Sequence, residues 1–476
     1  MTGSDRLKGR LRACIAPAAR KLIALVTGSG IAVVATLGRS QDVDPPKNPH
    51  LPNAWHSARI DPATGGRYLP DRNEELTRFQ ERVLRSGAAI PYPHYHDSRT
   101  VVMGIRSAGI NARTRRRVHL LVDNEQIDPG LTVLIATDEA PDVVAERLEL
   151  QGIEHREKVS IVRIAHDRPA HITFPFLRDY APIVRVKSTP DGFQTEGLVL
   201  FDGSTLNRVI DHRFGVESRR AKSTIDARFQ LTKNLVDFYS ERIGHPIQKY
   251  YLDLSMDGGN LITDGGGTCF LTKVFLDKND RSREFIHKEL ADKVGCVRSV
   301  FLDAPQRLDP IQHVDMQLYF ADRQNVVLSM PALYEGDRKA EYKNLNELLS
   351  MGYKVHRLPR KTASITYANI LTTKLNVYVP QYSRYLVESK QQLAINQQIR
   401  KLLRRGNVAR AKSLMQRSPQ TTVIDAAAEL SIDNLRALEL VQRLLPRKRV
   451  VPTDSDDTLR SWGSWHCRTH ELPEQL

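Results

Sequence analysis

A cysteine near the end of the sequence has neighbours of the kind that activate a thiol. Cys467 follows His466 and precedes Arg468, within the segment 463–471. Nearby positive charge lowers the pKa of a thiol, and the thiolate that results is a strong nucleophile. A cysteine close to a terminus is more often incidental, so this segment alone gives only a hypothesis of nucleophilic catalysis.

Two other segments combine a carboxylate with a basic residue. Arg178 and Asp179 are adjacent between two strand-like stretches, which is usually a structural arrangement. His313 and Asp315 flank Val314. Residues two apart in a strand point to the same face, so we expect the histidine and the carboxylate to share one. Such a pair can act in general acid–base catalysis, although a structural pair is the more common case.

The segment 257–267 is rich in glycine. It begins Asp257-Gly258-Gly259-Asn260, and two glycines allow close approach of the backbone. No Lys-Ser/Thr pair follows, so a phosphate-binding loop is a poor fit. The later stretch 264–267 (Asp-Gly-Gly-Gly) predicts a hairpin turn, and turn chemistry accounts for most of these residues.

Together these segments resemble the guanidine-modifying deiminases, in particular the bacterial peptidyl-arginine and agmatine deiminases. That group has, in order, Arg-Asp-x-Gly-Pro, a Gly-Gly-Asn…Asp-Gly hairpin, His-x-Asp, Tyr-x-Asn and a C-terminal His-Cys. The matching residues are 178–182, 258–265, 313–315, 367–369 and 466–467. The resemblance covers about residues 87–476 and is closer to the Porphyromonas-type peptidyl-arginine deiminases. Ala181 replaces the family glycine.

The resemblance implies a hydrolase of amidine C–N bonds. Cys467 would attack the guanidinium carbon of peptidyl-arginine and form a covalent thiouronium, which water converts to citrulline. His313 would transfer protons, and Asn369 would orient Cys467 or the intermediate. No metal and no organic cofactor is required. The residues implied for substrate binding are Asp179 and Asp315, which would pair with the guanidinium, together with Arg178, Gly259, Asn260 and Arg208.

The resemblance also implies a fold, a pseudo-fivefold α/β propeller of ββαβ units. The sequence pattern itself supports only an alternation of α and β elements, which indicates an α/β or α+β protein. We expect strands over 131–136, 160–164, 183–186 and 376–379, and strand pairs over 261–272 and 317–329. Helices are expected over 74–86 and 223–243. Residues 383–449 read as helical throughout, and we interpret them as a basic insertion before the C-terminal catalytic segment.

Three other hypotheses stay open. The chain could be an agmatine or free-arginine deiminase that acts on a small guanidino compound. It could be an amidinotransferase, which shares the fold. It could be a catalytically inactive propeller that acts as a binding module, although retention of His313, Asp179, Asp315 and Cys467 argues against that.

The composition is that of a basic folded protein. The 476 residues carry a formal charge of +15, and no zinc-finger or RNA-binding signature is present, so no nucleic acid is predicted as a partner. Four cysteines occur without a CxxC pair. If the N-terminus is removed three remain, so at least one thiol is free or bonded to another chain.

Export is expected from the N-terminus. A basic segment precedes an uncharged run over 22–38, as in a secretory signal or anchor that could associate with a membrane or envelope. A cytoplasmic protein is the alternative. The predicted organisation is a signal peptide or anchor over 1–40, a linker over 41–86 and the catalytic domain over 87–476.

Overall fold

The described part of the chain extends from residue 54 to residue 473 in a computed structural model. The predicted signal or anchor therefore lies outside the described residues. The segments within 54–473 that are not described are 106–109, 125–131, 138, 152–155, 164–176, 191, 204–231, 234, 242–246, 305–311, 332–334, 361–364, most of 388–421, and 460–463.

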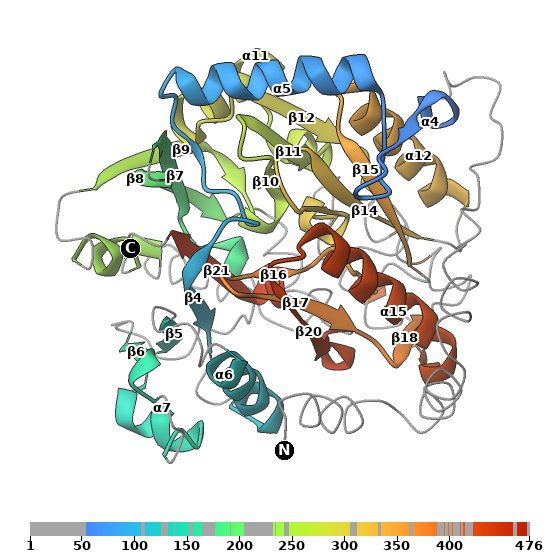
Figure 1. Cartoon of the computed structure of the whole chain (residues 1–476). Helices are drawn as coiled ribbons and strands as arrows, with labels where there is room; N and C mark the ends of the chain where they lie inside the picture. The colour runs from blue at the N-terminus through green and yellow to red at the C-terminus, as the bar shows by residue number, and fades with distance from the viewer. Residues whose placement is uncertain are drawn as a thin grey trace.

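Strands in the described residues form five sets with one connectivity (Figure 1). In each set an antiparallel pair is extended by a third strand parallel to the second. The α/β prediction is confirmed. The sets are β21 (Thr469–Pro473), β4 (Ser98–Gly104) and β5 (Thr132–Thr137); β7 (Ile183–Thr189), β8 (Gly192–Gly203) and β9 (Gln248–Met256); β10 (Ile262–Thr263), β11 (Thr268–Thr272) and β12 (Arg298–Leu302); β13 (Leu318–Phe320), β14 (Asn325–Pro331) and β15 (Lys354–Arg360); β16 (Leu371–Thr372), β17 (Asn376–Gln381) and β20 (Arg449–Asp454).

A helical segment joins the two parallel strands of each set, because parallel neighbours need a crossover connection. One face of each helix is apolar: in α15, Leu430, Ala437, Val441 and Leu444 are buried in one core cluster with Val379 of β17. The predicted helix over 223–243 is described only at residues 232–233 and 235–241, and these are helical. The crossover helices are α6 (Ala112–Asn124), the segment 232–241, α11 (Arg283–Glu289), α12 (Glu335–Ser350) and α15 (Ala427–Leu444).

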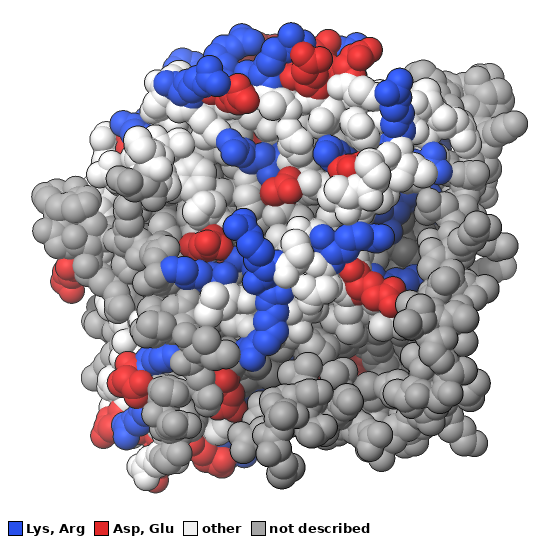
Figure 2. All heavy atoms as spheres, viewed as in Figure 1, with Lys and Arg blue, Asp and Glu red and all other residues white. Residues whose placement is uncertain are grey.

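The described part of the predicted linker, residues 54–86, is built into the fold. Trp55 of α4 (Ala54–Ser57) is buried, and β2 (Arg67–Tyr68) pairs with β15. Helix α5 (Pro70–Arg85) crosses the top of the molecule in Figure 1, where Gln80 donates a 2.8 Å hydrogen bond to Asp264. Over this helix Figure 2 shows acidic and basic side chains intermingled, in keeping with ion pairs such as Arg85–Glu81.

The prediction that residues 383–449 are helical throughout is wrong at their beginning. β18 (Arg384–Val387) pairs antiparallel with β19 (Thr422–Asp425), whose Thr-Val-Ile run favours a strand. Helix α15 follows, and it is the crossover of the last strand set rather than part of an insertion. Most of the residues between β18 and β19 lie outside the described part, so the basic helical insertion is not tested.

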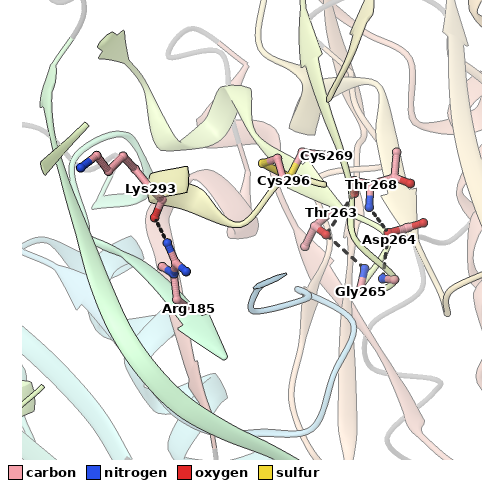
Figure 3. Close-up of a disulfide and its surroundings, with 9 residues drawn as sticks. Arg185, Thr263, Asp264, Gly265, Thr268, Cys269, Lys293 and Cys296 are labelled. Carbon is pink, nitrogen blue, oxygen red and sulfur yellow. Dashed lines mark hydrogen bonds between the residues drawn. A yellow bond between two sulfur atoms is a disulfide. The ribbon is translucent and has the colours of Figure 1, made fainter. Parts of the chain in front are cut away.

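A disulfide joins Cys269 of β11 to Cys296, just before β12 (Figure 3). The Cα atoms are 5.4 Å apart, and both residues are fully or almost fully buried. Cys467 is free, as the count of cysteines allowed. Within the described ranges, no helix combines the length and the apolar character that a membrane span needs.

Candidate active site

The short helix α16 (Trp465–Arg468) holds Cys467 inside the protein. The indole of Trp465 stacks on the ring of Tyr378 in β17, with the ring centroids 5.5 Å apart. The hydroxyl of Thr469 donates to the carbonyl of Trp465 at 2.8 Å. Cys467 is only 4% exposed, so its thiol is fixed in the core although it lies close to the C-terminus.

Asn369 is the immediate neighbour of the thiol. Its carbonyl oxygen accepts hydrogen bonds from the backbone N–H of Ser464 (2.8 Å) and of Cys467 (3.2 Å). Its amide nitrogen lies 3.0 Å from Sγ of Cys467 and 3.2 Å from Oδ2 of Asp315. Because both ends of the amide are engaged, Asn369 fixes the backbone and the sulfur of Cys467 together.

Asp315 is fully buried beside the same sulfur. Its Oδ2 lies 3.1 Å from Sγ of Cys467 and 2.9 Å from Nδ1 of His466. Its Oδ1 has no hydrogen-bond partner among the described residues. Burial raises the pKa of Asp315, but the hydrogen bond from His466 and nearby positive charge more than offset burial, and the pKa is lowered. The carboxylate is therefore ionised, with one oxygen available.

The prediction that His313 and Asp315 share a strand face is wrong. Residues Val314–Met316 form a 3-10 turn, η6, that begins directly after His313. Gln312 has a φ of 58°, and the N–H of Val314 donates to the side-chain carbonyl of Asn260 at 3.2 Å. These local features turn the chain before a strand can form, so the two side chains are directed to different partners.

His313 lies between two carboxylates. Its Nδ1 is 3.4 Å from Oδ1 of Asp179, and its Nε2 is 3.3 Å from Oδ2 of Asp257. Burial lowers the pKa of His313, but the charges of Asp179 and Asp257 outweigh it and raise the pKa to about 9. The imidazole is therefore protonated at neutral pH and able to donate a proton.

Asp257 is a site residue that the sequence analysis did not select. Besides His313, its Oδ2 contacts Nζ of Lys278 at 2.9 Å, and its side chain is 1% exposed. The signal was present, because Asp257 directly precedes Gly258-Gly259-Asn260 and that segment comes close to His313. His466 was likewise read only as an activator of the thiol, whereas it contacts Asp315.

Gly259 marks the point where the charged groups converge. A Cβ atom added to it would lie 2.8 Å from Nδ1 of His313, 2.9 Å from Oδ1 of Asp179 and 3.2 Å from Oδ2 of Asp315. Gly259 also donates its N–H to Oδ1 of Asp179 at 3.3 Å. The absence of a side chain therefore lets the backbone of Gly259 lie against both carboxylates and the histidine, where a Cβ atom would be too close to Asp179 and His313.

Two other predicted substrate-binding residues, Arg178 and Asn260, make contacts within the protein. Arg178 is 3% exposed, forms an ion pair with Glu471 and donates to the carbonyl of His466 at 3.3 Å. Asn260 accepts from the N–H and the hydroxyl of Thr272, both at 3.0 Å, so it supports β11. Arg208 lies outside the described residues.

The thiol of Cys467 is not activated by its surroundings alone. Burial raises its pKa well above the usual value, and the negative charges of Asp315 and Asp179 raise it further. The site therefore places carboxylates close to a protonated thiol. A cation that binds between the carboxylates would reverse this effect and favour the thiolate.

One group of side chains has the composition of a metal site. Ligand atoms of His94, His466 and Glu471 lie within 4.8 Å of one another. The guanidinium of Arg178 forms an ion pair with Glu471 and lies 3.2 Å from Nδ1 of His94. The positive charge of Arg178 lies against two of the three possible ligands, His94 and Glu471, and would repel a metal cation. This group therefore does not fit a metal centre.

The sequence pattern of the Porphyromonas-type peptidyl-arginine deiminases matches residues 124–410. The chain belongs to this family of guanidino-group deiminases, which are hydrolases of C–N bonds. The match ends before Cys467. The assignment of the C-terminal segment to the candidate site therefore depends on its His-Cys motif and on its geometry in the structure. No curated protein matches the chain in sequence.

Solved structures of deiminases share the fold. A Porphyromonas gingivalis protein described as a candidate arginine deiminase aligns with a TM-score of 0.55 and 16% identity, covering 81% of this chain and 99% of that protein. The agmatine deiminase of Enterococcus faecalis gives 0.55 and 16%, covering 83% and 98%. The C. jejuni agmatine deiminase gives 0.52 and 14%, covering 80% and 95%.

Proposed function

We propose that this protein hydrolyses the guanidinium group of peptidyl arginine to citrulline and ammonia, with Cys467 as the nucleophile. The observation that carries the proposal is the convergence of Asp179, Asp315 and His313 at Gly259. The sulfur of Cys467 lies beside the same oxygen of Asp315. Two buried carboxylates suit a planar cation with paired N–H donors.

In the first half of the reaction the guanidinium binds between the carboxylates, and its charge lowers the pKa of the Cys467 thiol. Sulfur then attacks the guanidinium carbon. Protonated His313 gives a proton to one amino group, the C–N bond breaks, and ammonia leaves. The product is a thiouronium in which the substrate carbon is bonded to sulfur. The thiol proton also passes to the departing ammonia, which leaves as ammonium, and His313 is left neutral.

In the second half water replaces the sulfur. His313 accepts a proton from water, the oxygen bonds to the carbon, and the C–S bond breaks. The second proton of the water returns to the thiol, and the ureido group of citrulline is released. Asn369 holds the sulfur in place throughout, through its 3.0 Å contact with Sγ.

The peptidyl substrate is supported by the family whose pattern the chain matches. Agmatine is the second candidate, because agmatine deiminases share the fold. The test is formation of ammonia and of the ureido product with four compounds: a peptide with internal arginine, a peptide ending in arginine, free arginine and agmatine. The ureido product is citrulline from the arginine compounds and the N-carbamoyl amine from agmatine. Cys467→Ser is the matched control, because a hydroxyl is a much weaker nucleophile at neutral pH.

Turnover of peptides but not agmatine supports the peptidyl function. Turnover of agmatine alone moves the protein to the small-molecule class. If none of the four compounds is turned over, the deiminase proposal is refuted and the inactive binding module is favoured. Equal activity in Cys467→Ser would exclude the covalent mechanism.

We also propose that the protein is exported, with its N-terminal segment as the signal or anchor. The buried Cys269–Cys296 disulfide supports this location, because disulfides persist mainly in oxidising compartments. The test is fractionation of the source cells followed by mapping of blocked thiols. Recovery of a reduced protein from the cytoplasm would contradict the proposal.

The five strand sets are further proposed to be arranged with pseudo-fivefold symmetry, as in a propeller. Their shared connectivity supports this arrangement. A crystal structure in which successive sets are related by very unequal rotations would refute it.

A further inference from the structure

The two oxygens of Asp315 have different surroundings. Oδ2 receives three contacts: Nδ1 of His466 at 2.9 Å, the sulfur of Cys467 at 3.1 Å and the amide of Asn369 at 3.2 Å. Oδ1 is buried and has no partner among the described residues. The carboxylate is thus held through Oδ2, which lies beside the nucleophile, while Oδ1 makes no hydrogen bond to the described residues.

His466 makes the shortest of these contacts. An ionised carboxylate can only accept hydrogen bonds, so Nδ1 of His466 must carry a proton whether the ring is neutral or charged. Asn369 is less able to hold Oδ2 alone, because the same amide nitrogen also contacts Sγ of Cys467 and the backbone carbonyl of Asp315.

The backbone of His466 is hydrogen-bonded to the segment that carries Asp179, the second carboxylate of the site. Nε of Arg178 donates to the carbonyl of His466 at 3.3 Å, and Arg178 directly precedes Asp179 in the turn η3 (Leu177–Asp179). Arg178 is itself fixed by its buried ion pair with Glu471 of β21. A continuous set of contacts therefore runs from Asp179 through Arg178 and His466 to Asp315.

We propose that His466 is a positioning residue that orients Asp315 for the guanidinium and, through Arg178, fixes its place relative to Asp179. This inference rests on the proposed function, since it concerns the binding of the guanidinium. The spacing matters because a planar cation must be reached by both carboxylates at once. In this arrangement His466 acts on substrate binding and does not itself touch the substrate.

The test compares three variants. His466→Phe keeps a planar ring but removes the donor, and we expect KM to rise about ten- to a hundredfold, as for loss of a charge-assisted hydrogen bond, with a smaller change in kcat. His466→Asn can present an N–H near the position of Nδ1 and should restore most of the loss. His119→Phe is the matched control, a half-buried histidine of α6 that bonds the carbonyl of Leu148.

A merely structural role would affect His466→Phe and His466→Asn alike, so equal impairment of both overturns the inference. A fall in kcat with unchanged KM overturns it as well, because that result would place His466 in a chemical step. A crystal structure of His466→Phe should show Asp315 rotated, and an unmoved carboxylate would refute the positioning role.

Failure of the proposed function can be told apart from failure of the positioning role if the wild-type protein turns over none of the guanidino compounds. The proposed function then fails, but the crystal structure still decides whether His466 orients Asp315. Protection of Cys467 by agmatine against alkylation with iodoacetamide gives a second measure that needs no turnover. Protection that is equal in the wild type and in His466→Phe would contradict a role in guanidinium binding.

Discussion

Replacement of Gly259 by alanine adds one methyl group at the centre of the site. The backbone tolerates alanine there, because the φ of Gly259 is not in the left-handed region. The added Cβ would lie 2.8 Å from His313 and 2.9 Å from Asp179, whereas non-bonded carbon contacts are favourable at about 3.5–4.0 Å. The effect of the substitution is therefore purely steric.

The expected cost to folding is that of overpacking, about 1–3 kcal/mol, which should lower the unfolding temperature by a few degrees. The expected cost to activity is much larger, because the methyl group would displace Asp179 and His313, which are proposed to bind and to protonate the guanidinium. A displacement of about 1 Å in a reacting group can cost about a hundredfold in rate. Steady-state kinetics and thermal unfolding of the same preparation separate the two effects.

Gly87→Ala is the matched control. Gly87 has a φ of +68° with nothing within 4 Å of the added Cβ, so alanine there costs backbone strain of about 1–2 kcal/mol away from the site. Similar loss of stability with retained activity is expected for this variant. Wild-type activity in Gly259→Ala would refute the assignment of the pocket.

Three further predictions concern stability. Folding raises the pKa of His313 from 6.5 to about 9, so protonation of this histidine contributes about 3 kcal/mol to the free energy of unfolding. This contribution is fully present below pH 6.5 and is lost as the pH rises through about 9. Urea unfolding that does not weaken over this range would contradict the shift. Asp257→Asn removes one carboxylate that raises this pKa, so the stabilisation should be smaller and its loss complete at a lower pH; an unchanged profile would exclude the pairing. Replacing Cys269 and Cys296 by serine should cost about 3.5 kcal/mol, the chain-entropy value for a loop of 27 residues, and guanidinium unfolding with an unshifted midpoint would refute that contribution.

The candidate reacting groups could be selected from the sequence because their residue types follow a family order along the chain. Cys467, Asn369, His313, Asp315 and Asp179 do come together in the structure, within one buried site. Strand pairs with strong turn signals, such as β10 and β11 around residues 264–267, were also predictable, because glycine-rich turns act locally.

Contacts between distant segments could not be predicted in this way. Periodicity and composition report on the neighbours of a residue along the chain, whereas Asp257 meets His313 across 56 residues and His466 meets Asp315 across 151. Cys269 and Cys296 become partners only because β11 and β12 lie parallel in one sheet.

The sequence by itself determined which groups are candidates for the proposed chemistry and that the fold is α/β. Only the tertiary structure decided what each group faces. His313 and Asp315 were expected on one strand face, but a turn directs the first to Asp257 and Asp179 and the second to Cys467. Arg178 shares the motif of Asp179, yet its charge is neutralised by Glu471 from the far end of the chain. The physical reason is that burial and pairing set the ionisation and availability of a group, and both depend on segments that meet only after folding.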